Sequence, residues 1–240
     1  MKKIVVFGLI FICFGCIPKK EKGQQLQPIK IVKLNISEPS GIAYFNNHFY
    51  IVSDQNGRVF KTSLEGEVFQ KIKTGYSDLE GISFNNISNT FYLVNEKKRE
   101  IIEIDSLGKF IKKRIVKGSQ KHKNSGLEGI CFDEKEKVLY VLNEKSPKQL
   151  LKLREEGKII ESFKLDFSDD VSGICFDNAS NSFWVVSDES QLLMNINKKG
   201  ELISSFNIPV SKAEGVIIHK NKIYIVSDLE NTLYAFKIPN

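Results

Sequence analysis

A four-residue phrase occurs five times in this chain, and no other feature of the sequence constrains the fold as strongly. Its sequence is LEGI at 79–82 and 127–130, with the variants PSGI at 39–42, VSGI at 171–174 and AEGV at 213–216. The glycines of successive phrases are 40, 48, 44 and 42 residues apart. A repeat of this length is typical of a four-stranded propeller blade.

Each repeat has the same internal order. A short apolar strand begins at the phrase, a turn rich in Asn and Asp follows, and two further strands come next. Four repeats then pass through a glycine turn into a fourth strand, at Gly66, Gly108, Gly157 and Gly200. The fifth repeat lacks this strand, but the stretch 28–41, PIKIVKLNISEPSG, aligns with the fourth strands of the other repeats.

These observations predict an all-β fold over residues 28–240, a five-bladed β-propeller of four-stranded blades. The N-terminal strand is expected to pair into the C-terminal blade, which closes the ring and removes exposed strand edges. An open β-solenoid is the alternative interpretation, but an open array gains nothing from dividing one repeat between its two ends.

The N-terminal residues have the pattern of an export signal. Two lysines precede the apolar run 4–14, which is shorter than the roughly twenty residues that a membrane-spanning helix needs. A glycine and Cys16 then resemble a bacterial lipoprotein processing site, so we expect a lipoprotein-type signal peptide over 1–16 with Cys16 lipidated. A plain secretory signal is the alternative. Residues 17–27 are polar and aperiodic, which favours a flexible tether. The expected location is therefore the bacterial cell envelope, on a membrane anchor, facing the periplasm or the surface.

The charge distribution argues against nucleic acid as a partner. The formal net charge is +6, but residues 1–22 hold five lysines and one glutamate, which leaves 30 basic and 28 acidic residues for the rest. No basic stripe with interleaved aromatic residues is present. We expect a monomer that contacts the membrane through a lipid anchor and binds an unknown ligand or an envelope protein.

Two cysteines lie outside the predicted signal, at matching positions of two repeats. Cys131 and Cys175 both occur in the sequence GICF. Matching positions in neighbouring repeats need not lie within disulfide distance, so buried free thiols are expected.

Carboxylates are expected to converge at one mouth of the central channel. In an antiparallel blade, the start of the first strand and the end of the second lie on the same face. A carboxylate ends the second strand of all five repeats, at Asp54, Glu96, Glu144, Asp188 and Asp228. A position filled alike in every repeat favours a structural role, since an acid after Ser or Asn is a good turn former.

The second letter of the phrase breaks this symmetry. It is serine at two positions and glutamate at three, in the order Ser40, Glu80, Glu128, Ser172 and Glu214. Three glutamates at one rim repel one another unless Lys97, Lys145 and Arg99, or a bound cation, offset their charge.

Calcium is the expected cation, because it takes several carboxylate and amide oxygens. The predicted metal ligands are Glu80, Glu128 and Glu214, and the predicted ligand-binding residues are Asn95, Glu96, Asn143 and Glu144. The three histidines are unrelated in phase, which disfavours zinc or iron and leaves no nucleophile–base pair, so no catalytic residue is predicted. The loop 116–126 is basic, and it is either a solvated loop or a recognition element for an anionic ligand.

Four stretches carry a resemblance to a known family: DLEGISF, GLEGICFDEKEKVLYVLNEKSP, DVSGICFDNASNSFWVVSDESQLL and AEGVIIHKNKIYIVSD. They resemble the SdiA-regulated family of bacterial envelope propellers over about residues 28–240. The resemblance implies a β-propeller that is exported or tethered to a membrane, and it implies no particular activity. The first-strand pattern is also similar to that of NHL and gluconolactonase-like propellers, which hold a metal in the channel, but a full matching ligand set is absent here.

Three functions remain open from the sequence. The first is a non-catalytic binding module with calcium at the acidic mouth. The second is a metal-dependent hydrolase of lactones or phosphoesters, in which a channel cation activates water and a spare glutamate serves as base. The third is a structural interaction protein of the envelope with an empty channel.

Overall fold

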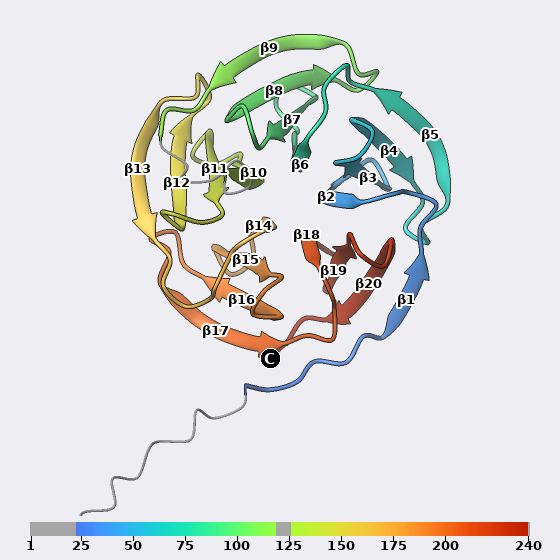
Figure 1. Cartoon of the computed structure of the whole chain (residues 1–240), viewed down its shortest axis with the longest axis vertical. Helices are drawn as coiled ribbons and strands as arrows, with labels where there is room; N and C mark the ends of the chain where they lie inside the picture. Colours follow the sequence, from blue (N-terminus) through green and yellow to red (C-terminus); the bar gives the residue numbers. More distant parts are fainter. Residues whose placement is uncertain (1–22, 119–125, 240) are drawn as a thin grey trace, which may run out of the picture.

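The computed structural model describes residues 23–118 and 126–239 as twenty strands in five four-stranded antiparallel sheets. The sheets surround a central axis, with the first strand of each repeat innermost (Figure 1). The predicted five-bladed β-propeller is therefore confirmed. The predicted signal peptide with Cys16, and residues 119–125 of the basic loop, lie outside the described residues.

The blades are numbered in the order in which their phrases occur along the chain. Blade 1 contains β2 (Pro39–Phe45), β3 (His48–Ser53), β4 (Arg58–Thr62) and β5 (Val68–Lys73). Blade 2 contains β6 (Leu79–Asn85), β7 (Thr90–Asn95), β8 (Glu100–Asp105) and β9 (Phe110–Ile115). Blade 3 contains β10 (Leu127–Asp133), β11 (Val138–Asn143), β12 (Gln149–Arg154) and β13 (Ile159–Lys164). Blade 4 contains β14 (Ile174–Asp177), β15 (Ser182–Ser187), β16 (Leu192–Ile196) and β17 (Leu202–Asn207).

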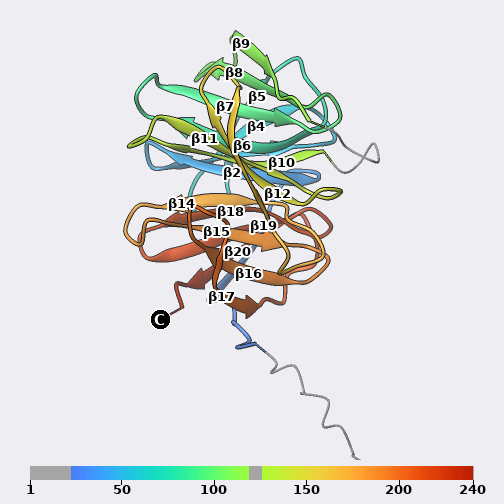
Figure 2. The ribbon, with the colours of Figure 1, turned by 90° about the vertical axis from the view of Figure 1, so that its left-hand side faces the viewer.

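Blade 5 joins the two ends of the chain, as the displaced repeat predicts. It contains β18 (Ala213–His219), β19 (Lys222–Ser227), β20 (Thr232–Lys237) and β1 (Lys30–Lys33). The register pairs Lys30 with Ala235 and Lys33 with Thr232. Both ends of the described chain lie at the same edge of the molecule (Figure 2).

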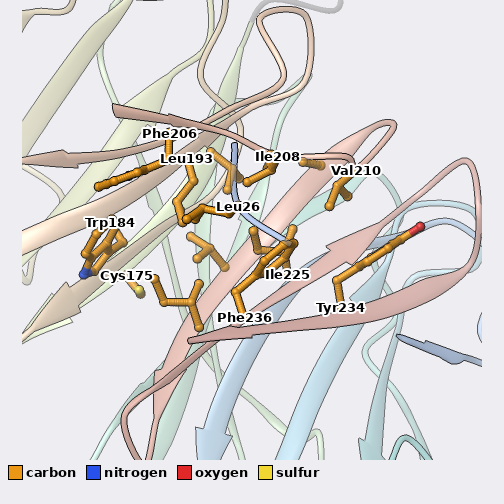
Figure 3. Packing of buried hydrophobic residues seen from close by; sticks show 14 residues of the cluster. Leu26, Cys175, Trp184, Leu193, Phe206, Ile208, Val210, Ile225, Tyr234 and Phe236 are labelled. Atoms are coloured by element: carbon orange, nitrogen blue, oxygen red, sulfur yellow. The ribbon is translucent and has the colours of Figure 1, made fainter. Parts of the chain in front are cut away.

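The segment before β1 contacts a second blade. Gln25 bridges Asn207 at the end of β17, and the Leu26 amide donates to the Asn207 carbonyl at 2.9 Å. The Leu26 side chain is buried between blades 4 and 5 (Figure 3). These residues belong to the stretch 17–27, so the last part of the expected tether lies against the propeller.

The interior consists of hydrophobic clusters that each draw on two neighbouring blades. The cluster in Figure 3 combines Trp184 and Leu193 of blade 4 with Ile225 and Phe236 of blade 5. Cys175 lies in the same cluster, and both it and Cys131 are buried free thiols, as expected.

The glycine of the phrase is required by close approach at the axis. A Cβ on Gly129 would lie 2.6 Å from the Ser172 carbonyl oxygen, and one on Gly173 would lie 2.2 Å from that of Glu214. Real Cβ atoms do not come so close to backbone. The five inner strands therefore narrow the channel at the level of these glycines. The space on the side where the first strands begin forms a cup-shaped cavity, called the cup below.

Candidate functional site

The cup is a polar cavity of about 230 Å³ at the mouth where the phrases begin. We call its lining the acidic mouth: it comprises eleven carboxylate residues, three lysines and two serines. The carboxylates are Asp54, Asp78, Glu80, Glu96, Glu128, Glu144, Asp170, Asp188, Glu189, Glu214 and Asp228. The lysines are Lys97, Lys145 and Lys212, and the serines are Ser40 and Ser172. All three predicted metal ligands lie here together.

A β-bulge places the glutamates of the phrase. Leu79 pairs with Asn95 and Gly81 pairs with Val94, which leaves Glu80 without a partner in the register. The same shift occurs at Glu214 in β18. A bulge re-aims one side chain without changing the others, so the apolar letters of the phrase stay in the core while the glutamate lines the cavity.

Of the three phrase glutamates, Glu128 is the one that is buried. The residue is 8 % exposed, and among the described residues its side chain forms no hydrogen bond and no ion pair. Burial raises its pKa well above the ordinary value, and the charges of Glu80 and Glu214 add to the rise. A buried carboxylate without a partner is costly, so the site favours a proton or a cation beside it.

The serine of the phrase in blade 1 has a hydrogen-bond partner. The Ser40 hydroxyl donates to the Leu79 carbonyl of the next blade at 2.5 Å. Ser40 therefore ties two blades together, whereas Glu128 faces the cavity. This contrast supplies a physical distinction between the two letters at these positions.

Three other glutamates of the acidic mouth are also shifted toward the protonated form. Burial raises the pKa of Glu96 to about 7, against the hydrogen bond that its Oε1 accepts from the Gly126 amide at 3.0 Å. Burial raises the pKa of Glu214 to about 8, although the charge of Lys212 opposes the rise. Glu80 is raised well above its ordinary value by burial and then by Asp54 and Glu214. Burial is the main cause of this common direction, and repulsion among the neighbouring carboxylates adds to it.

Two groups of three carboxylates have the spacing of a metal site. Oxygens of Glu96, Glu128 and Glu144 all lie within 4.8 Å of one another, and so do those of Asp54, Asp78 and Glu80. Glu214 lines the cavity outside both groups. The two glutamates that end the second strands in blades 2 and 3 therefore join the phrase glutamate of blade 3.

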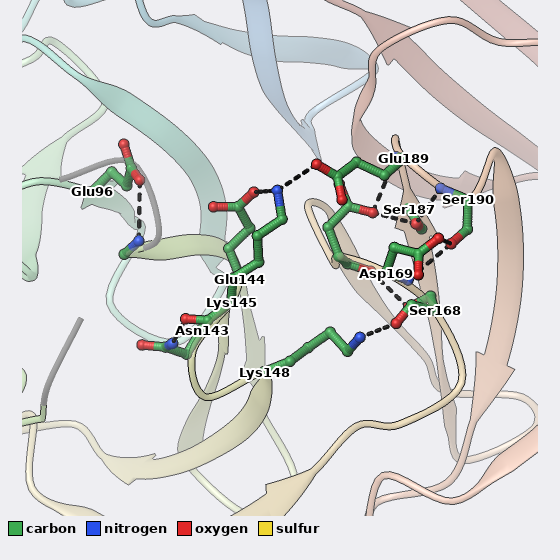
Figure 4. A network of polar contacts seen from close by, with 12 residues as sticks. Glu96, Asn143, Glu144, Lys145, Lys148, Ser168, Asp169, Ser187, Glu189 and Ser190 are labelled. Carbon is green, nitrogen blue, oxygen red and sulfur yellow. Dashed lines mark hydrogen bonds and ion pairs between the residues drawn. The ribbon is translucent and has the colours of Figure 1, made fainter. Parts of the chain in front are cut away.

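The lysines of the acidic mouth form ion pairs with only some of its carboxylates. The Lys145 ammonium lies 3.0 Å from Glu144 and 2.7 Å from Glu189, and Figure 4 shows it between them. Lys97 pairs with Asp78. These contacts leave Glu128 without an ion-pair partner among the described residues.

Two of the predicted ligand-binding residues are Asn95 and Asn143. The side-chain amides of both form hydrogen bonds that hold loops. Asn95 donates to the Ser77 carbonyl at 2.5 Å and accepts the Lys98 amide at 3.0 Å. Asn143 donates to two loop carbonyls and accepts from Arg99. Neither lines the acidic mouth.

The turn after the second strand is also stabilised by the residue before the carboxylate. The Ser187 and Ser227 hydroxyls accept the amides of Ser190 and Glu230 at 3.1 and 3.2 Å. The carboxylates that follow are consequently available to the cavity. The structural role expected for the acids therefore belongs, in these turns, to the residue that precedes them.

Sequence reasoning missed two acids at the position before the phrase. Asp78 accepts the Lys97 amide at 2.8 Å, and Asp170 accepts the Glu189 amide at 3.1 Å and the Ser187 hydroxyl. Both side chains therefore fix the neighbouring turn and line the cavity. The sequence signal that could have revealed them is their shared position, one residue before the phrase.

Several solved structures are similar in fold to this chain. The Myxococcus xanthus glutaminyl cyclase structure is similar at TM-score 0.72 with 12% identity, over 91% of this chain and 100% of that one. A virginiamycin B lyase from Staphylococcus aureus is similar at TM-score 0.54 with 13% identity, over 85% of this chain and 67% of that one. A chain of a nidogen/laminin complex is similar at TM-score 0.59 with 16% identity, over 83% and 76%. At these identities the likeness shows the fold alone.

No curated protein matches the chain. Within residues 23–118 and 126–239, no helix has the length and apolarity to cross a membrane. The model of the SdiA-regulated family matches residues 19–237, which is nearly the whole chain. The protein belongs to the SdiA-regulated family.

Proposed function

We propose that the protein is a binding module of the bacterial cell envelope, held to a membrane by a lipid on Cys16, and that its acidic mouth binds Ca²⁺. Glu128, buried in the cavity without a described partner, carries this proposal. A hard cation beside it offsets the repulsion among its neighbours, and calcium accepts the six to eight oxygen ligands that such a cup offers.

The ligands proposed for the cation are Glu96, Glu128 and Glu144, whose oxygens have suitable mutual spacing. Glu80 and Glu214 face the same cavity and complete the charge around it. The cavity is open on one side, so a ligand or partner protein can reach the cation with an oxygen of its own.

Calcium-dependent melting tests the proposal. The chelated protein is titrated with CaCl₂, and the wild type is compared with Glu128→Gln and with Glu67→Gln, an exposed glutamate remote from the cavity. We expect calcium to raise the melting temperature of the wild type and of Glu67→Gln, and Glu128→Gln to weaken calcium binding at least tenfold. An equal response in Glu128→Gln, or no response in the wild type, contradicts the proposal.

A second candidate is a metal-dependent hydrolase of lactones or phosphoesters. The observation that favours it is the presence of two separate carboxylate groups in one cavity. One group can hold a cation, which leaves Asp54, Asp78 or Glu80 as a base for water. Turnover of a lactone or phosphoester that EDTA abolishes supports this function, and no turnover across a panel of both classes rejects it.

A further inference from the structure

Arg99 is a buried cation without a counter-ion among the described residues. The residue is 8 % exposed, its Nη1 donates to Asn143 Oδ1 at 2.5 Å, and its Nε donates to the Val116 carbonyl at 3.4 Å. Both partners are neutral. The other buried arginine, Arg114, differs because its Nη2 lies 2.6 Å from a carboxylate oxygen of Glu103. An unpaired buried charge is unfavourable, so the fold retains Arg99 at a cost.

The backbone adds to this cost. Arg99 has φ +51° in the turn after β7, a left-handed conformation that a long side chain rarely adopts. The equivalent residues of three other blades are Gly57, Gln191 and Asn231, with φ between +47° and +57°. The shared φ shows that this conformation belongs to the turn of the repeat, so the unpaired charge is what distinguishes Arg99 from its equivalents.

The guanidinium lines a cavity of about 170 Å³ between blades 2 and 3, distinct from the acidic mouth. Lys117 supplies a second positive charge, and Gln149 and Ser162 supply neutral donors from β12 and β13. Among the residues that the structure describes, no carboxylate lines this cavity. The volume has room for several water molecules, and therefore for a small anion.

Two neighbours hold the guanidinium in place. Asn143 Nδ2 donates to the carbonyls of Lys145 at 3.1 Å and Pro147 at 2.7 Å, so its Oδ1 must face Arg99. A Cβ on Gly118 would lie 2.7 Å from Arg99 Nη2, so a side chain at this position would displace the guanidinium. Arg99 is consequently pre-organised toward the cavity.

We propose that this cavity binds a small oxyanion, phosphate or carboxylate, on the guanidinium of Arg99. The planar fork of N–H donors matches two oxygens of either group, and Lys117 adds charge at the entrance. Asn143 is a positioning residue, because it orients the guanidinium. The site does not depend on a cation in the acidic mouth.

The test measures binding of sodium phosphate and of sodium acetate to the full chain by calorimetry and by melting temperature, in EDTA at constant ionic strength. The site variant is Arg99→Gln, which copies Gln191 at the equivalent turn position. The matched control is Lys98→Gln, which removes one charge from the exposed side of the same turn. A second variant, Lys117→Gln, keeps Arg99 and changes only the second charge.

We expect one of the two oxyanions to raise the melting temperature of the wild type, and the preferred anion distinguishes a tetrahedral from a planar ligand. Arg99→Gln should weaken that binding at least tenfold and be no less stable than the wild type without the anion. Lys98→Gln should bind as the wild type does, and Lys117→Gln should bind several-fold more weakly. No response to either anion in the wild type, or equal binding by Arg99→Gln, overturns the proposal.

Discussion

Replacing Glu96 with glutamine should change stability in a pH-dependent way. Glu96 is 5 % exposed, and burial raises its pKa from 4.5 to about 7. Between these two values the folded protein holds a proton that the unfolded chain has lost. Stability is therefore lost as pH rises through this window, because ionising the buried group is unfavourable.

The magnitude follows from the pKa. A rise from 4.5 to about 7 corresponds to about 3 kcal/mol, since each pH unit contributes about 1.4 kcal/mol. Glutamine carries no such charge, and its Oε1 can still accept the Gly126 amide. Without calcium, Glu96→Gln should match the wild type at pH 4.5 and exceed its unfolding free energy by about 3 kcal/mol at pH 8.

Urea unfolding in EDTA, followed by the fluorescence of Trp184, measures this difference. Glu67→Gln serves as the control and should track the wild type at both pH values. Saturating calcium should reverse the order at pH 8, because Glu96 then serves as a ligand. A difference between wild type and Glu96→Gln that is independent of pH refutes the account of a strained, buried carboxylate.

Three further predictions concern the scaffold, each checked by urea unfolding. Gly129→Ala should lower the free energy of unfolding by about 1–3 kcal/mol, because the new Cβ would meet the Ser172 carbonyl. A loss below about 0.5 kcal/mol, the usual effect of a surface substitution, contradicts the close approach. Arg114→Gln should lose about 3–5 kcal/mol by leaving Glu103 unpaired, and Glu103→Gln in the same chain should recover part of it. Leu26→Ala should lose about 2–3 kcal/mol through a cavity between blades 4 and 5, and an unchanged midpoint argues against its packing there.

The fold could be predicted because the sequence features that specify it recur at a regular spacing. Five glycines at blade spacing and one displaced strand specify the number of blades and the manner of closure, and both are local patterns in the sequence. Trp184 occupies a repeat position that is tyrosine in the other four repeats, and it lies in the cluster shared by blades 4 and 5.

The candidate site could be predicted only in part. Glu80, Glu128 and Glu214 converge as expected, because the repeat fixes their level on the axis. Their grouping could not be foreseen, since it depends on side-chain lengths and on neighbouring turns: Glu128 lies with Glu96 and Glu144 rather than with the other phrase glutamates. The role of Asn143 beside Arg99 depends on a contact between blades, which no pattern within one repeat records.

The most direct test of the central claim is anomalous diffraction from crystals of the full chain grown in saturating CaCl₂ without chelator. The account predicts one strong peak in the acidic mouth, with oxygens of Glu96, Glu128 and Glu144 at about 2.3–2.6 Å from it. A cavity without a peak under these conditions, or a peak that remains unchanged in crystals of Glu128→Gln, contradicts it.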